Sequence, residues 1–99
     1  MATQGNFKER TKDRVKEPKQ YKVIMHNDDF TTMEFVVEIL IAIFRKDQIT
    51  AEALMMDVHK KGLAVVGRYP YDIAISKTNK AMALAKESGY PFKMTVEED

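Results

Sequence analysis

The chain has 99 residues and a formal net charge of +1, and it contains no cysteine. This length is typical of one domain, and the lack of cysteine excludes disulfides and thiolate metal sites. No apolar stretch approaches the roughly 18 residues of a membrane span, and the start lacks the apolar segment of a secretory signal, so we expect a cytoplasmic protein.

The first twenty residues differ in composition from the rest. They carry six basic and three acidic residues, and Phe7 and Val15 are their only large apolar side chains beyond the initial methionine. Such a segment cannot bury enough apolar surface to offset the entropy cost of ordering. We therefore expect a flexible N-terminal extension at residues 1–20 and a single folded domain at residues 21–99. A basic arm can contact nucleic acid or an acidic partner, but a solvated tail is the simpler interpretation.

The sequence of the first half of the domain predicts a strand, a turn and a helix. Residues 21–25 are β-prone, and the run Asn27-Asp28-Asp29 favours a turn because these side chains bond to nearby backbone. Thr31 and Glu34 have the spacing of a capping box, which predicts that a helix begins there. Apolar residues follow at helical spacing on so many sides that this helix should be largely buried.

The second half predicts two further helices and two strands. A helix should begin at the cap Asp47 and end at Gly62, where a left-handed conformation suits glycine. Residues 63–66 predict a buried strand, Pro70 suits the first turn of a third helix, and residues 92–96 alternate as in a half-exposed strand. One side of the third helix should carry Ile73, Ala74, Lys77, Ala81, Leu84 and Ala85. The expected fold is α+β, with three helices packed on a three-stranded antiparallel sheet in the order β-α-α-β-α-β.

Two features could carry chemistry. The run Asn27-Asp28-Asp29 concentrates hydrogen-bond acceptors that suit a cation with several N–H donors, although ordinary turn formation explains the same residues. His59 shares a helical stripe with Met55 and Val58, where a packed core histidine is the alternative interpretation.

Metal binding and catalysis are disfavoured. His26, Asp28, Asp29 and His59 could supply metal ligands, but no paired-ligand spacing supports such a site and adjacent carboxylates point apart. The serines have no catalytic motif around them, and no glycine-rich phosphate loop is present. We therefore expect neither a cofactor nor an enzyme.

Three blocks of the sequence resemble ClpS, the adaptor of the Clp AAA+ protease. They are YKVIMHNDDFTTMEFVV at residues 21–37, Val58-His59 with Gly62 followed by VGRYPYDIAISK at residues 66–77, and YPFKMTVE at residues 90–97. The resemblance runs from Tyr21 to the C-terminus without obvious insertions. It implies a fold related to the C-terminal domain of the ribosomal L7/L12 stalk protein.

The resemblance also implies a function and partners. ClpS proteins bind N-degrons, which are free N-termini that begin with Phe, Leu, Trp or Tyr, and deliver these substrates to the ClpA unfoldase for degradation by ClpP. The implied partners are the N-terminal domain of a ClpA-type unfoldase and N-degron proteins, with no nucleic acid or membrane. The implied state is a monomer in the bacterial cytoplasm, with a plastid stroma as the less favoured location.

Family positions assign a two-part site. The α-amino group would be bound by Asn27, Asp28, Asp29 and His59, with Asp28 acting through water or by shaping the turn. The side-chain pocket would be formed by His26, Thr31, Met33, Val36, Met55, Val58 and Phe92. His26 stands where the family usually has Leu, Ile or Val, and Phe92 stands where Leu is usual, so the accepted first residues are expected to be fewer or shifted.

The resemblance further implies that Asp72 and Lys77 dock on the unfoldase from the exposed side of the third helix. Two other functions remain open from the residues alone. One is a ribosome- or RNA-associated protein of the same fold that uses the basic arm, which would bind nucleic acid in a strongly salt-dependent way. The other is a divergent ClpS that docks on the unfoldase without recognising N-termini.

Overall fold

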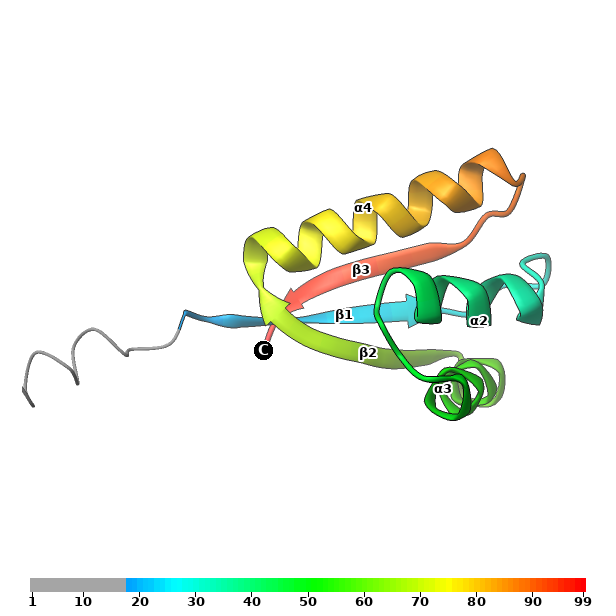
Figure 1. Cartoon of the computed structure of the whole chain (residues 1–99), viewed down its shortest axis with the longest axis horizontal. Coiled ribbons are helices and arrows are strands. Elements are labelled where there is room, and N and C mark those ends of the chain that lie inside the picture. The colour runs from blue at the N-terminus through cyan, green and yellow to red at the C-terminus, as the bar shows by residue number, and fades with distance from the viewer. Residues whose placement is uncertain (1–17) are drawn as a thin grey trace, which may run out of the picture.

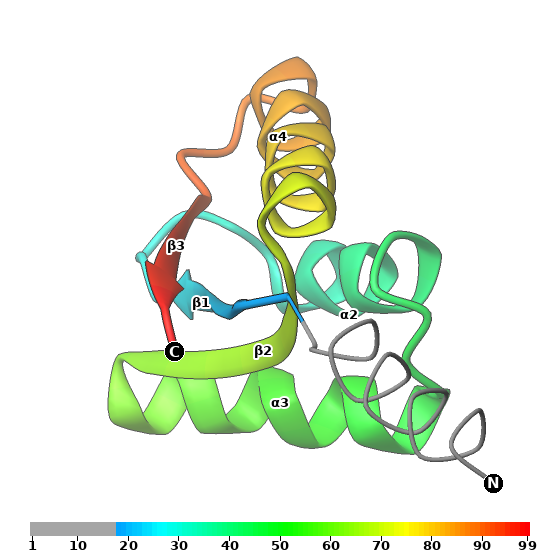
Figure 2. The ribbon, with the colours of Figure 1, turned by 90° about the vertical axis from the view of Figure 1, so that its left-hand side faces the viewer.

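The computed structural model describes residues 18–99, so nearly all of the predicted extension at residues 1–20 lies outside the described residues. The elements are β1 (Gln20–His26), α2 (Met33–Ala42), α3 (Gln48–Lys61), β2 (Leu63–Pro70), α4 (Tyr71–Glu87) and β3 (Lys93–Glu98). The strands form one antiparallel sheet in the order β2-β1-β3, with α2 and α4 over one face and α3 alongside β2 (Figures 1 and 2). The predicted α+β fold and its element order are confirmed.

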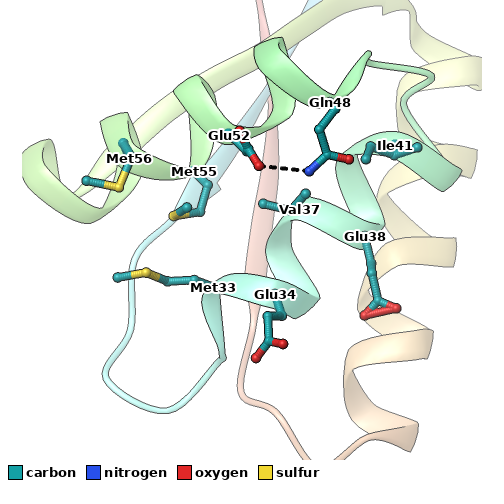
Figure 3. Close-up of a pocket in the computed structure, with 9 residues that line it drawn as sticks. All are labelled: Met33, Glu34, Val37, Glu38, Ile41, Gln48, Glu52, Met55 and Met56. Atoms are coloured by element: carbon teal, nitrogen blue, oxygen red, sulfur yellow. Dashed lines mark hydrogen bonds between the residues drawn. The ribbon is translucent and has the colours of Figure 1, made fainter.

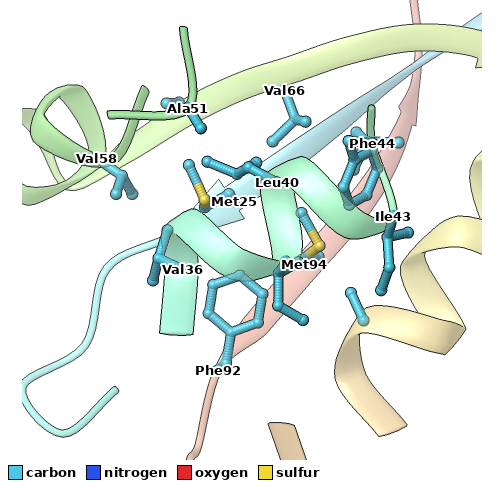
Figure 4. Packing of buried hydrophobic residues seen from close by; sticks show 14 of the residues in the cluster. Met25, Val36, Leu40, Ile43, Phe44, Ala51, Val58, Val66, Phe92 and Met94 are labelled. Atoms are coloured by element: carbon cyan, nitrogen blue, oxygen red, sulfur yellow. The ribbon is translucent and has the colours of Figure 1, made fainter. Parts of the chain in front are cut away.

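The hydrophobic core lies between β1 and the helices. Val23 and Met25 of the central strand are fully buried on the helix side, since alternate side chains of a strand point to opposite faces. Figure 4 shows Leu40 of α2, Ala51 and Val58 of α3 and Val66 of β2 around Met25. The core therefore holds the end of β1, from which the acidic run continues, against α2 and α3.

The first helix begins at Met33, and its N-cap is Thr32 rather than the predicted Thr31. The Thr32 hydroxyl oxygen accepts a hydrogen bond from the Phe35 N–H at 3.1 Å. The Thr31 hydroxyl donates instead to Asp28. The capping-box prediction was wrong because the preceding turn holds Thr31, which leaves the next threonine to cap the helix.

The face that α4 packs on the sheet is narrower than predicted. Its buried residues are Ala74, Thr78, Ala81 and Ala85. The large side chains Ile73 and Leu84, expected on the same side of the helix as these alanines, are 45% and 41% exposed. Small residues at a spacing of three and four let the helix lie close to the strands, which leaves the bulky neighbours outside.

The predicted caps of α3 are confirmed, and they join the end of β1 to the end of this helix. Asp47 accepts a hydrogen bond from the Thr50 N–H at 2.8 Å, and Gly62 adopts a φ of 91°. The Gly62 carbonyl accepts a hydrogen bond from the Asn27 N–H at 2.9 Å. The acidic run is thereby held beside the C-terminal turn of α3, at the opposite end of β1 from the C-terminus of the chain (Figure 1). Within residues 18–99, no helix has the length and apolar character needed to cross a membrane.

Candidate functional site

The loop between β1 and α2 is organised around Asp28. One carboxylate oxygen, Oδ1, accepts hydrogen bonds from the Phe30 N–H at 2.8 Å and the Thr31 N–H at 2.7 Å. The other oxygen, Oδ2, accepts the Thr31 hydroxyl at 2.7 Å. Both carboxylate oxygens of Asp28 therefore accept hydrogen bonds from within the loop. Of the two roles expected for Asp28, shaping the turn and binding through water, these contacts correspond to the first.

These bonds also set the charge state of Asp28. Its partial burial alone would raise the pKa of the carboxyl, but the hydrogen bonds from Thr31 and Phe30 outweigh it and hold the pKa below its ordinary value. Asp28 is consequently ionised at neutral pH, and the loop carries two adjacent negative charges with Asp29.

The loop forms one wall of a cavity of about 390 Å³. The cavity has a polar end and an apolar end, supplied by the loop, α2 and α3. Its lining residues are Asn27, Asp28, Asp29, Phe30, Thr31, Thr32, Met33, Val36, Met55, Val58 and His59. The structure thus brings together all four residues predicted to bind an amino group and five of the seven predicted for the side-chain pocket.

The polar end offers acceptors that face solvent. Asn27, Asp29 and His59 are exposed, so His59 is not the packed core histidine that the sequence also allowed. His59 lies in the last turn of α3, where the unpaired carbonyls of a helix carry a partial negative charge. An amide, a carboxylate, an imidazole and a helix C-terminus together suit a cationic group with several N–H donors.

The apolar end is formed by methionine and valine side chains. Val36 and Val58 are buried at 7% and 4% exposure, whereas Met33 at the start of α2 is 45% exposed. Met55 of α3 lies across from Met33 (Figure 3). A rigid valine floor with flexible methionines at the rim suits apolar groups of several shapes, because methionine adapts readily to what it contacts.

Two residues predicted for the pocket, His26 and Phe92, do not line the cavity. His26 follows the inward-facing Met25, so strand alternation directs it to the other face of the sheet, where its Nε2 lies 2.8 Å from the Thr95 hydroxyl. Phe92 lies just before β3 and is 6% exposed in the core, with its ring centroid 6.2 Å from that of Phe35. Both residues were predicted to lie on the wall of the cavity, but the backbone directs their side chains elsewhere.

Phe30 lines the cavity but was missed from the sequence. It is 75% exposed at the tip of the loop, and its N–H is bound by Asp28. An aromatic residue between two turn-forming stretches was the available signal, because a large apolar side chain in a polar turn has little to pack against unless it serves a ligand.

The two residues predicted to contact the unfoldase differ in their surroundings. Asp72 is exposed in the first turn of α4. Lys77 is only half-exposed, and its ammonium donates a hydrogen bond to the Ile43 carbonyl at 2.8 Å. The same ammonium lies 5.8 Å and 5.6 Å from the ring centroids of Phe44 and Tyr69. Lys77 therefore joins α4 to the end of α2, which corrects its predicted place on the freely exposed side.

The described part of the chain holds no group of side chains suited to bind a metal ion. Among residues 18–99, no three histidine, cysteine or carboxylate side chains are grouped so that they could hold a metal ion. The cavity is instead suited to a monovalent organic cation whose charged end adjoins an apolar group. A primary ammonium next to a large apolar side chain has this chemistry.

Comparisons with known proteins show which family the chain resembles. The family described as "ATP-dependent Clp protease adaptor protein ClpS" matches residues 16–95. The ATP-dependent Clp protease adapter protein ClpS of Clostridium acetobutylicum is 49% identical over 100 residues, which cover 99% of both chains. The protein of the same name from Treponema denticola is 52% identical over 81 residues, which cover 82% of this chain and 80% of the relative.

A solved structure is similar as well. It is that of Agrobacterium tumefaciens ClpS2 bound to L-phenylalaninamide, with a TM-score of 0.81 and 43% sequence identity. The match covers 84% of this chain and 100% of that one. The likeness therefore includes the whole of the relative's fold, not a shared fragment.

Proposed function

The chain belongs to the ClpS family, the adaptors of the ATP-dependent Clp protease, and from this membership we propose that it binds N-degrons and delivers them to a ClpA-type unfoldase. As its relatives are named adapter proteins, the chain is an adaptor and not an enzyme. The proposed substrates begin with a free Phe, Leu, Trp or Tyr. The observation that carries the proposal is one cavity with Asn27, Asp29 and His59 at its polar end and methionines and valines at its apolar end.

Each end of the cavity suits one part of such an N-terminus. The α-ammonium group has one positive charge and three N–H donors, which match the exposed acceptors of the loop and α3. A first side chain such as Phe would enter the apolar end, where burial contributes roughly 2–3 kcal/mol. The solved relative bound to L-phenylalaninamide supports this assignment, since that ligand combines an α-amino group with a phenyl ring. We expect micromolar or tighter affinity.

Blocking the α-amino group is expected to abolish binding. We predict that a labelled peptide beginning with Phe binds at least about a hundredfold more tightly than the same peptide with an acetylated Phe, because acetylation removes the charge and two donors. Fluorescence anisotropy with peptides that begin with Phe, Leu, Trp, Tyr or Ile, and with acetyl-Phe, measures both the amino group and the side chain. Equal binding of the Phe and acetyl-Phe peptides, or binding of neither, would refute the proposal.

Residues 1–20 are proposed to be an extension that the unfoldase engages during delivery, with residues 21–99 as the adaptor domain. The position of β1 supports a boundary near this point, since this strand begins at Gln20 and the Gln20 carbonyl accepts a hydrogen bond from the Asp99 N–H. A variant that lacks residues 1–17 should bind the Phe peptide unchanged and fail in delivery.

Asp72 is the proposed contact with the unfoldase, and Lys77 is proposed to combine this contact with a structural role. Asp72→Lys should weaken association with the unfoldase N-terminal domain at least about tenfold, because it reverses an exposed charge. Peptide binding should not change, since the start of α4 lies at the other end of the domain from the β1–α2 loop, whose residues line the cavity (Figure 1). Calorimetric titration of each variant with the unfoldase domain and with the Phe peptide tests both statements.

Lys77→Met should lower the free energy of unfolding by about 1–2 kcal/mol, because the Ile43 carbonyl loses a charged hydrogen-bond donor. Thermal melts followed by circular dichroism, on this variant and the unaltered protein, measure the change. If Lys77→Met melts normally, the hydrogen bond to Ile43 contributes nothing to stability.

A further inference from the structure

The sulfur chemistry of this chain depends on methionine alone. The chain contains seven methionines and no cysteine, so a thioether is the only kind of side-chain sulfur that an oxidant can attack. Within residues 18–99, the methionines differ widely in exposure. Met33 is 45% exposed and Met55 is partly buried, and both line the cavity, whereas Met25 and Met94 are 0% and 3% exposed in the core.

The two methionines of the cavity lie close to its mouth. Met33 is the first residue of α2, and Met55 lies within α3. Figure 3 shows their side chains extending toward each other from the two helices. A small oxidant in the solvent can therefore reach these sulfurs, while the packing of the core keeps it away from Met25 and Met94.

The surroundings of these two sulfurs decide what oxidation would change. A thioether is apolar and adapts to apolar ligands, whereas a sulfoxide is polar. The neighbouring Val36 and Val58 line the same cavity, and their side chains have no hydrogen-bond donor. An apolar first side chain that fills this end would remove water from the sulfoxide oxygen without replacing its hydrogen bonds, which is unfavourable.

We propose that Met33 and Met55 form a reversible oxidation site, and that their conversion to the sulfoxide weakens the binding of an apolar first residue. The inference rests on the proposed function, because these side chains line the end of the cavity that would receive this residue. Oxidation would thereby turn off substrate recognition while leaving the fold intact.

The reaction requires hydrogen peroxide or a related peroxide as the oxidant. A lone pair of the thioether sulfur attacks one peroxide oxygen, so that an S–O bond forms as the O–O bond breaks. The proton of the transferred oxygen passes to the departing hydroxide, which leaves as water. The sulfur is oxidised by two electrons and the peroxide is reduced by two. A methionine sulfoxide reductase with a thiol as the electron donor reverses the change.

The first test determines which methionines react in the folded protein. The unaltered protein is treated with hydrogen peroxide, and the sulfoxides are located by mass spectrometry of its proteolytic fragments. Met33 and Met55 should react at least about tenfold faster than Met25 and Met94. Saturating L-phenylalaninamide should slow the reaction at Met33 and Met55 but not at Met56, a neighbour on α3 that does not line the cavity.

The second test measures the effect of oxidation on binding. Fluorescence anisotropy should show that the Phe peptide binds the oxidised protein at least about tenfold more weakly, because a polar oxygen is left without a partner. Treatment with the reductase and a thiol should restore the starting affinity, which excludes damage to other side chains such as His59. The melting temperature of the oxidised protein should not fall, since the core methionines remain unoxidised.

The variant Met33→Leu with Met55→Leu removes both sulfurs and keeps apolar side chains of similar volume. Whatever the starting affinity of this variant, peroxide should change it by less than about twofold, because no sulfoxide can form in the cavity. The matched control is Met56→Leu with Met82→Leu, which removes two sulfurs that do not line the cavity and should keep the full loss of affinity. If the cavity variant binds too weakly to measure, ligand protection and restoration by the reductase decide the question with the unaltered protein.

The failure of the oxidation site is distinguishable from the failure of the proposed function. If neither the Phe peptide nor L-phenylalaninamide binds the unoxidised protein, the proposed function fails and the oxidation site fails with it. If they bind but sulfoxides at Met33 and Met55 leave the affinity unchanged, or if the cavity variant loses affinity as strongly as the unaltered protein, the oxidation site alone is overturned. A loss of affinity that accompanies oxidation of Met25 and a lower melting temperature would show unfolding instead, which also overturns it.

Discussion

Replacing Asp29 with asparagine is expected to weaken the binding of a Phe-starting peptide at least about thirtyfold. Asp29 lines the polar end of the cavity and is exposed, and its carboxylate has no hydrogen-bond partner within residues 18–99. The substitution keeps the shape of the side chain and removes the negative charge that opposes the ammonium. Removing one partner of a hydrogen-bonded charge pair costs roughly 2–5 kcal/mol, and we take the lower part of that range because the site is open to solvent.

The control for this prediction is Asp57→Asn. Asp57 is an exposed aspartate on α3 that does not line the cavity and forms a 3.9 Å ion pair with Lys61. Both variants should melt within a degree or two of the unaltered protein, so that a loss of affinity cannot be assigned to unfolding. Unchanged affinity in Asp29→Asn would mean that the ammonium group is bound elsewhere.

Asp28→Ala is expected to reduce both stability and binding, unlike Asp29→Asn. The side chain accepts three hydrogen bonds that shape the loop, and their loss should lower the free energy of unfolding by about 2 kcal/mol. Peptide affinity should fall at least about tenfold because Asn27 and Asp29 lose their fixed positions. Denaturant unfolding and anisotropy measure the two effects on the same samples, and a variant that melts and binds normally would remove Asp28 from the loop's framework.

A double-mutant cycle with Thr31→Val isolates the contact between the two side chains. Thr31→Val removes the hydroxyl that donates to Oδ2 and leaves both backbone donors, so it should cost about 1 kcal/mol alone. The pair of substitutions should cost less than the sum of the single ones, because the second change finds the bond already lost. Simple additivity would show that the hydroxyl contributes nothing through Asp28.

The stability difference between Asp28→Ala and the unaltered protein should also depend on pH. The pKa of Asp28 is lowered in the folded state, so its contribution is fully present above the ordinary carboxyl value of about 3.9. The contribution is lost as the pH falls through the lower folded-state pKa, where the carboxyl becomes protonated. The two stability curves should therefore converge in acid and stay parallel above about pH 5.

The acidic run thus divides its work between neighbouring residues. Asp28 holds the loop, Asn27 is tied by its N–H to the end of α3, and Asp29 keeps its carboxylate exposed at the cavity. In the sequence, the adjacent positions of Asp28 and Asp29 argued against a metal site, because adjacent carboxylates point apart. The same geometry allows one of them to shape the turn while the other remains available to a ligand.

The apolar end of the cavity bears on which first residues of a substrate the protein accepts. His26 and Phe92 were expected to alter the pocket because they depart from the usual family residues, yet neither lines it. Phe92 belongs to the core cluster that also contains Val36, so it contacts the site only from behind its floor (Figure 4). We propose that the choice among Phe, Leu, Trp and Tyr depends instead on residues that line the apolar end, which are Met33, Val36, Met55 and Val58.

Local patterns in the sequence were enough for the order of the elements and for two of the caps. The caps at Asp47 and Gly62 and the order of strands and helices depend on residues a few positions apart, whose preferences act without the rest of the fold. The cap of α2 shows the limit of this reasoning, because Thr31 and Thr32 are equally good caps by residue type. Only the hydrogen bonds of Asp28 decide between them.

The tertiary structure alone decided what residues far apart in the chain do to one another. Lys77 bonds to Ile43, 34 positions away, and His26 lies against Thr95, 69 positions away, so their side chains are unavailable for the roles that local patterns or family positions suggested. The cavity likewise needs separate elements, since the loop after β1, α2 and α3 all line it. Sequence periodicity indicates which face of an element is apolar, but only packing shows which faces meet and which remain open to a ligand.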